Sequence, residues 1–300
     1  MSGGESKLPA QGGGDENDAI LSDSIQMHQK QGLLLRLFLW LVKKTGALGR
    51  LVRHQVWFFL VMLGACWGVL FESISQNAWR RTVRYEFGTT MNSVIGGGLI
   101  ATLFAGTLTG VAAVSQTIYW LGVAGMAKMT GSILINVVVR EIAPILVGIL
   151  LLGRNGMLSV TELGLLTTGG QIRSFQAQGI DPFLLLVMPR TLAFTVAGFT
   201  LGIVFSIASL LTGYIISRVS GVVTSPVWSF FNDVISAMST ADYIMIPLKF
   251  VTVGFVVGVG SCITGLTATS QDNLRTLLPR GFSRGMLIVM AVSVLFSLDF

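Results

Sequence analysis

The chain has 300 residues, of which 52% are hydrophobic and 11% are charged, and its mean hydropathy is +0.74. A soluble domain has about 25% charged residues, so this chain lacks the polar side chains that would cover a globular surface in water. The composition excludes a cytosolic globular protein, a disordered protein and a disulfide scaffold, and it predicts an all-α polytopic membrane protein.

The net charge of +6 does not indicate a nucleic-acid partner, because the basic residues lie between apolar runs rather than along one polar face. Cys66 and Cys262 lie within apolar stretches and are predicted to be small buried hydrophobes. Both histidines, His28 and His54, are near the N-terminus, so we expect no metal site. No Walker A motif is present, and any ATP hydrolysis is therefore expected in another polypeptide.

The N-terminal third begins with a polar segment and becomes apolar gradually. Residues 1–31 are rich in Gly, Ser, Gln and acidic residues, which predicts a flexible tail on the cytoplasmic side. Residues 32–53 alternate leucines with basic residues, which predicts an amphipathic helix in the lipid headgroup region, with an ordinary packed helix as the alternative. The run 56–71 has about 16 residues, near the lower limit for a span. We assign 32–90 to one interfacial region.

Five longer apolar stretches predict membrane spans, at about 91–117, 131–153, 183–217, 244–268 and 285–300. They make up a predicted membrane domain over 91–300. The third stretch would be more than about 50 Å long as one helix. The last has only about 16 residues, or about 24 Å of helix, so either this span stops short or the chain has lost its tail.

The placement of basic residues decides the role of the short run 56–71. If this run crosses the membrane, Arg80, Arg81 and Arg84 fall outside, against the positive-inside bias. If it enters and leaves on one side, as an elbow, these arginines lie inside together with Arg154 and Arg190. The charges therefore predict an elbow helix, five spans and a cytoplasmic N-terminus.

The longest interior segment, 154–182, is predicted to carry a helix along the membrane face at about 160–178. Gly153-Arg154 marks the predicted cytoplasmic end of the preceding span, where Arg anchors at the headgroups. Gly169-Gly170 interrupts the helical pattern, and Asp181, followed by Pro182, predicts the start of the next helix. A surface helix of this kind could dock another protein.

A few polar and small residues within the spans are candidates for function. Arg140-Glu141 lies within an apolar stretch, where it forms either a structural ion pair that locks spans together or part of a transport cycle. Gly97 and Gly98 give the first span a small face, for helix packing or for a bulky ligand. Gln116 is a polar group near the outer end of that span. No nucleophile–base pair is evident, so we do not expect an enzyme.

Several short motifs follow one another in order over about 50 residues: Val139-Arg140-Glu141-Ile142-Ala143-Pro144, Gly153-Arg154, Glu162-Leu163-Gly164, Gly179-Ile180-Asp181-Pro182 and Pro189-Arg190. Together they resemble the MlaE-type permeases, the membrane subunits of ABC transporters that work with MCE proteins. Weaker similarity runs from about residue 50 to the end. Gln116 precedes Arg140 at the spacing expected for the family.

The resemblance implies a homodimeric permease with an elbow helix and five spans in each subunit. Bacterial and chloroplast members would share these motifs, and the Gly- and acid-rich start, which is unlike an Arg/Ser-rich transit peptide, favours a bacterial inner membrane. It implies a cytoplasmic ABC ATPase, which would hold ATP and Mg, docked on the interior helix, and a periplasmic MCE protein on the outer face. The implied substrate is a phospholipid or related lipid. The motif positions Glu162, Gly164 and Asp181, with Arg173 nearby, are the implied ATPase-coupling residues. The interior helix departs from the family where Gly170 and Gln176 replace frequent acidic residues.

The expected mechanism moves lipid from a pocket at the dimer interface that is lined partly by 91–117, with Gln116 contacting the headgroup. Two other classes of protein stay open. One is a membrane scaffold that anchors partners through the interior helix. The other is an ion-coupled secondary transporter, which the sequence disfavours because Glu141 is the only clear carboxylate within a span.

Overall fold

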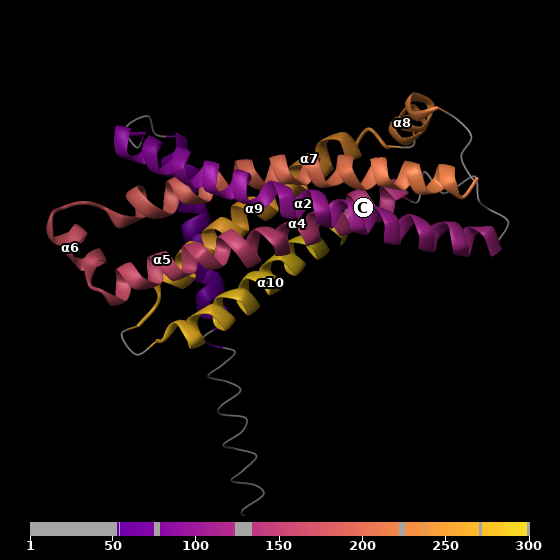
Figure 1. The fold of residues 1–300 in the computed structure, drawn as a ribbon. Helices are drawn as coiled ribbons and strands as arrows, with labels where there is room; N and C mark the ends of the chain where they lie inside the picture. The colour runs from indigo at the N-terminus through magenta and orange to yellow at the C-terminus, as the bar shows by residue number, and fades with distance from the viewer. Residues whose placement is uncertain are drawn as a thin grey trace, which may run out of the picture. The chain divides into compact units, whose positions relative to one another are not determined.

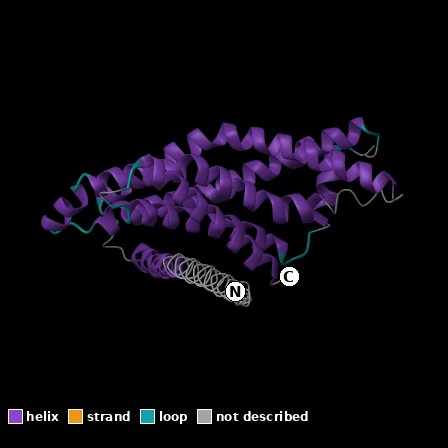
Figure 2. Ribbon diagram, turned by 90° about the horizontal axis from the view of Figure 1, so that it is seen from below, coloured by secondary structure: helices purple, strands orange, loops and turns teal. Residues whose placement is uncertain are grey.

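The computed structural model describes Arg53 and residues 55–74, 79–123, 134–221, 226–236, 238–269 and 272–298. Within these ranges all regular structure is helical (Figures 1 and 2). Five of the helices are long and apolar enough to cross a membrane, which confirms the all-α membrane class: Gln55–Ile74, Arg81–Trp120, Phe183–Val219, Asp242–Leu266 and Leu274–Leu298. The predicted tail at 1–31, and the amphipathic helix at 32–53 apart from Arg53, lie outside the described residues.

The segment predicted as an elbow is one uninterrupted helix of 20 residues, Gln55–Ile74. At 1.5 Å per residue it is about 30 Å long, which is sufficient to cross the hydrocarbon layer. Its backbone has no break at which the chain would turn back. The assignment to an elbow therefore rests on the charge distribution and stays a prediction.

Residues 62–298 form the second compact unit of the chain. It contains four long helical stretches: α2 (Arg81–Val123), the π-helical turn η5 (Phe183–Val187) leading into α7 (Met188–Val219), α9 (Asp242–Leu266) and α10 (Leu274–Leu298). The predicted span 131–153 corresponds to η3 (Leu134–Ile142), α4 (Ala143–Leu151) and η4 (Leu152–Gly156). Two short helices, α6 (Gln171–Ala177) and α8 (Val227–Ser236), lie at opposite ends of this unit (Figure 1). We refer to these ends as the α6 end and the α8 end.

The helix does not end at Gly153-Arg154, where the sequence predicts the cytoplasmic end of the second span. The backbone stays helical from Leu134 to Thr168, because η4 passes directly into α5 (Met157–Thr168). The Asn155 side chain donates to the Val94 carbonyl of α2, 3.3 Å away, and a Cβ at Gly156 would lie 2.8 Å from Ser261 Oγ. Asn155 and Gly156 thus pack tightly against α2 and α9 where the helix continues. The predicted interior helix at 160–178 is accordingly two helices, α5 and α6, and α5 continues the helix of residues 134–156.

The break between α5 and α6 lies at the predicted glycines. Gly170 has φ +75°, a left-handed conformation that glycine adopts without a steric penalty. The start predicted at Asp181 is also confirmed, because its Oδ1 accepts a hydrogen bond from the Phe183 N–H at 2.9 Å.

The expectation of a short last span is also wrong, because α10 begins at Leu274 rather than near residue 285. Its 25 residues correspond to about 37 Å of helix. The first turns of α10 contain arginines and Pro279, which interrupt the apolar pattern, so hydropathy does not indicate that the helix begins there. Arg280, in that segment, pairs with Asp272 just before the helix, at 3.2 Å.

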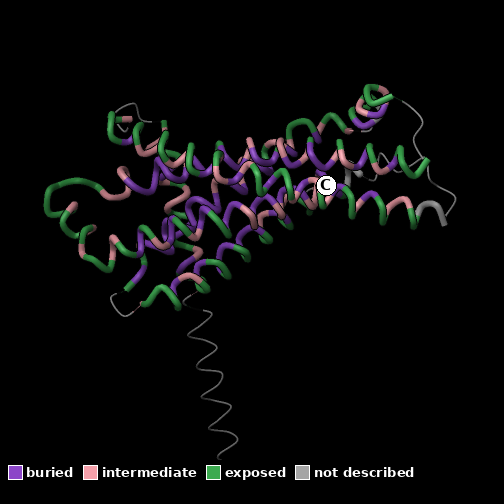
Figure 3. The backbone as a smooth tube through the Cα atoms, in the orientation of Figure 1, coloured by how far each residue is buried: buried purple, intermediate pink, exposed green. Residues whose placement is uncertain are grey.

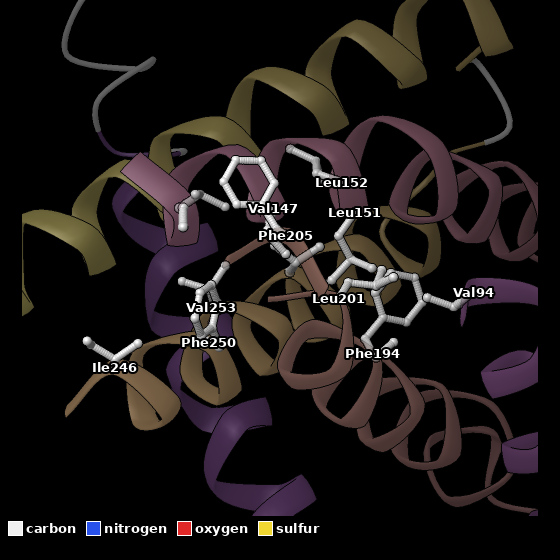
Figure 4. Close-up of a cluster of buried hydrophobic side chains, with 14 of the residues drawn as sticks. Val94, Val147, Leu151, Leu152, Phe194, Leu201, Phe205, Ile246, Phe250 and Val253 are labelled. Carbon is white, nitrogen blue, oxygen red and sulfur yellow. The ribbon is translucent and has the colours of Figure 1, made fainter. Parts of the chain in front are cut away.

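The core of this unit forms where α7 contacts α2, α4 and α9 (Figures 3 and 4). Phe194, Leu201 and Phe205 of α7 are buried in one cluster with α4 and α9 side chains. Glycines bring the helices close: a Cβ at Gly198 would lie 2.8 Å from Gly254 Cα, and one at Gly106 would lie 2.9 Å from the Phe205 carbonyl oxygen. Small residues at such crossings allow close approach of membrane helices.

Candidate functional site

Four charged side chains meet between η3 and the first turns of α9. Lys249 Nζ lies 3.1 Å from Glu141 Oε2 and donates to the Arg140 carbonyl oxygen at 3.0 Å. Arg140 Nη1 lies 3.4 Å from Asp242 Oδ1 and its Nε lies 3.9 Å from Glu141 Oε1. Two cations and two carboxylates thus form a neutral network that joins the second span to α9.

Two of the four charged side chains in this network are buried. The side chains of Lys249 and Asp242 are only 4% and 7% exposed, whereas those of Arg140 and Glu141 are 29% and 35% exposed. A charge within a membrane segment is costly unless it is paired, so the opposite charges of this network offset the cost of burying one another. Asp242 Oδ2 also accepts a hydrogen bond from the Ser239 N–H at 2.9 Å, which fixes the start of α9.

A second polar site lies nearer the α6 end, where α2, α5 and α7 meet. Glu162 of α5 pairs with Arg190 of α7, with 2.8 Å between Oε2 and Nη1. The pair borders a cavity of about 160 Å³, lined largely by polar side chains: Glu86, Thr89, Thr90, Ser93, Asn155, Ser159, Glu162 and Arg190. This volume could hold roughly five water molecules. Arg190 is buried, and its Nε has no hydrogen-bond partner among the described residues.

The π-helical turn η4 directs two adjacent side chains toward α2. Besides the Asn155 hydrogen bond to Val94, the Arg154 guanidinium lies over Gly97, where a Cβ would be only 2.6 Å from Arg154 Cζ. Short π-helical insertions in α-helices often lie at functional sites, since they re-aim side chains. Gly97 therefore makes room for Arg154.

The segment predicted to couple to an ATPase contacts three other helices. A Cβ at Gly164 would overlap Leu277 of α10, and a Cβ at Gly265 of α9 would lie 2.7 Å from Leu163 Cβ. Glu162 provides the third link, to α7. Beyond them, Arg173 is exposed on α6, none of whose residues is buried. Movement of α5 would thus act on α7, α9 and α10 together.

The three predicted substrate-pocket residues lie apart. Gly98 is buried, and a Cβ there would lie 3.0 Å from a methyl of Leu201, so it serves helix packing. Gly97 lies beneath Arg154, and Gln116 is exposed about 28 Å further along α2.

A family model described as Permease MlaE matches residues 87–298 of the 300. The chain belongs to the MlaE permease family. The matched range includes the four-charge network and both members of the Glu162–Arg190 pair.

Several proteins are similar to this MlaE-family chain at lower identity. One is the chloroplastic protein TRIGALACTOSYLDIACYLGLYCEROL 1 of Arabidopsis thaliana, 24% identical over 74% of this chain and 60% of that protein. A probable ABC transporter permease of Synechocystis is 25% identical over 57% of this chain and 63% of its own length. A probable ABC transporter permease of Rickettsia prowazekii is 24% identical over 42% and 48%. The chain thus spans less than two thirds of each of these relatives.

Sequence reasoning on this MlaE permease missed half of the four-charge network. Arg140 and Glu141 were evident as charges in an apolar run, but Lys249 and Asp242 were not singled out. Lys249 is itself an isolated charge within the apolar stretch 244–268, and that signal could have identified it. Its partner Glu141 is 108 residues away in the sequence, so no local pattern links the two.

Proposed function

We propose that the chain is the permease subunit of an ABC transporter that moves a phospholipid or related lipid between the membrane and an MCE protein. A separate cytoplasmic ATPase would supply the energy, and two copies of the chain would form the translocation path. The observation that carries the proposal is the continuity of α5 with the second span, together with its links to α7, α9 and α10. The MlaE family match supports the same assignment.

In the proposed cycle, closure of the ATPase pair pushes on α6 and the adjoining end of α5. Because Leu163 and Gly164 contact α9 and α10 without space for an added methyl group, α5 cannot slide past those helices freely. The Glu162–Arg190 pair passes the displacement to α7. A local push thereby becomes a rearrangement of several spans, which a lipid-sized path requires.

Two apolar surfaces support a second copy and a lipid cargo. Ile100, Phe104 and Leu108 of α2 are 76%, 67% and 55% exposed, and α10 exposes Leu287 and Leu295. In a membrane protein such surfaces face lipid or another helix. The name of the Arabidopsis relative includes a glycolipid, trigalactosyldiacylglycerol, which agrees with a lipid cargo here. Of the three pocket candidates, Gln116 remains the proposed headgroup contact, because it is exposed on α2 whereas Gly97 lies beneath Arg154 and Gly98 packs against Leu201.

The pairing of the carboxylates argues against an ion-coupled secondary transporter. Glu141 and Asp242, the two carboxylates of the four-charge network, are each paired with a cation. A carboxylate that couples ion flow to transport must bind and release a proton or metal ion in each cycle, whereas cations of the protein itself already occupy these two carboxylates.

A transfer assay tests the proposal. The chain is co-purified with its ATPase, reconstituted in liposomes that contain a fluorescent phospholipid, and mixed with the soluble domain of an MCE protein. We expect transfer between liposome and MCE domain that requires Mg-ATP. A complex that hydrolyses no ATP and transfers no lipid would instead support the scaffold.

A further inference from the structure

An elongated apolar cavity lies between α7 and α9, on the half of these helices nearer the α8 end. Its volume is about 250 Å³. From Phe199 to Leu210 it follows one face of α7 for about 16 Å, and Asp242, Ile246 and Phe250 of α9 line the opposite wall. Because this volume is small for a cavity of that length, the cavity is narrow, and we call it the slot.

The three polar side chains that line the slot are all occupied within the protein. The Ser206 hydroxyl donates to the Gly202 carbonyl at 2.9 Å, and the Tyr243 hydroxyl donates to the Ile235 carbonyl at 3.0 Å. Asp242 accepts a hydrogen bond from Ser239 N–H and is paired with Arg140. The hydroxyl hydrogens of Ser206 and Tyr243 are thus used within the protein, and the rest of the lining apart from Asp242 is apolar, so most of the slot favours an apolar occupant.

One long side of the slot opens to the surface of the unit. On its margin, Ile203, Ile207 and Tyr243 are 40%, 49% and 49% exposed. Both α7 and α9 are long and apolar enough to span a membrane. In a bilayer this side faces hydrocarbon, and an apolar cavity does not retain water. The slot is too narrow for a helix, whose diameter with side chains is about 10 Å. A single flexible chain suits its length and width.

The end of the slot toward α6 is closed by an aromatic ring. Phe250 lies against Gly202, where a Cβ would be 2.5 Å from its Cγ. The other end lies at Met238 and Asp242, beside the four-charge network. The slot is thus apolar at its closed end and polar at its other end, the polarity of a lipid molecule.

We propose that this slot binds one acyl chain of a bilayer lipid, with the chain end at Phe250 and the lipid headgroup toward Asp242. The site goes beyond the proposed transport function, because a lipid held here on the α7–α9 face is not required to be cargo. It forms a tail-binding site within one copy of the chain, separate from the interface between copies.

Photolabelling tests the proposal on the full-length protein. The chain is placed in nanodiscs of palmitoyl-oleoyl phosphatidylcholine with a trace of the same lipid carrying a diazirine near the end of one acyl chain. Adducts are mapped by mass spectrometry. We expect them to concentrate on peptides that contain residues 199–210 and 238–250. Ser206→Trp, which fills the slot, should lower them about tenfold, the change given by a loss of ~1.4 kcal/mol of binding free energy.

Ile215→Trp is the matched control, since Ile215 is an exposed residue of α7 outside the slot. It should leave the adducts unchanged. Ile207→Trp replaces Ser206→Trp if the latter does not elute as a folded protein, because Ile207 is half exposed and its side chain can be enlarged at the margin. Equal labelling in the filled variant and the control would overturn the proposal, as would a co-purifying membrane polypeptide that shields the slot from label.

Discussion

Lys249 of α9 and Glu141 of η3 form an ion pair, 3.1 Å between Nζ and Oε2, in which the lysine is almost wholly buried. The same ammonium donates to the Arg140 carbonyl oxygen, so it also satisfies a backbone group in the π-helical turn. One side chain thereby ties α9 to the second span at two points. Loss of Glu141 removes the carboxylate partner of the buried ammonium, whereas loss of Lys249 leaves Glu141 with Arg140 alone, at 3.9 Å.

Lys249→Met should lower the free energy of unfolding by roughly 1–3 kcal/mol, the cost of leaving buried polar groups without partners. The double variant Lys249→Met/Glu141→Gln should be less destabilised than the two single variants predict together, because it removes both charges. Thermal unfolding of the four proteins in one detergent measures this interaction energy. Additive effects would show that the two side chains do not interact.

Glu162→Lys should lower lipid-stimulated ATP hydrolysis of the assembled complex by roughly fivefold or more, the size of a coupling free energy of ~1 kcal/mol. The substitution replaces an attraction to Arg190 by a repulsion and so uncouples α5 from α7. The charge-exchanged variant Glu162→Arg/Arg190→Glu should recover part of the rate. Unchanged stimulation in Glu162→Lys would remove this residue from the coupling route.

Gly254→Val should destabilise the chain by roughly 1–3 kcal/mol, because overpacking moves the backbone of neighbouring helices. A Cβ at this position would be 2.5 Å from the Phe194 carbonyl oxygen and 3.2 Å from Gly198 Cα. Gly88→Ala is the control, since open space surrounds Gly88 in α2. It should be neutral or stabilising by up to about 1 kcal/mol. Similar melting temperatures for the two variants would contradict the close α7–α9 crossing.

Asp272 should contribute a pH-dependent part of the stability. Hydrogen bonds from the Thr269 backbone N–H and hydroxyl, with the nearby Arg280 guanidinium, hold the pKa of this carboxyl below its usual value of 3.8. Because the folded-state pKa is depressed, the stabilisation is complete above the unfolded value and is lost as the pH falls below it. Asp272→Asn should therefore be less stable than wild type at pH 6, with a gap that narrows as the pH falls below 3.8. A gap of constant size across this range would assign the effect to something other than ionisation.

The sequence predicts the helices of this fold better than their junctions. Long apolar runs require helices in a membrane, so hydropathy predicts that these stretches are helical. It does not by itself decide the role of Gln55–Ile74 or locate the start of α10. The continuation through Gly153 and Gly156 does not follow from hydropathy either, because it depends on the Asn155 contact with α2 and on the fit of Gly156 against α9. These partners are distant in sequence and become adjacent only after folding.

The residues of the candidate site are also only partly predictable from the sequence. Arg140, Glu141, Glu162 and Arg190 are recognisable from their motifs, but the partners Lys249 and Asp242 come from a helix about 100 residues further along the chain. The glycines of α2 show that a sequence pattern does not predict which contacts each residue makes. Gly97 and Gly98 are neighbours in sequence, yet one lies under Arg154 and the other packs on α7, because successive residues of a helix point about 100° apart.

Purification from the native membrane, with mass spectrometry of the bound proteins and lipids, tests the lipid-permease assignment most directly. We predict that the chain is recovered with an ABC ATPase, an MCE protein and a stoichiometric phospholipid or related lipid. Recovery of the chain with neither ATPase nor lipid would contradict the assignment and favour a membrane scaffold.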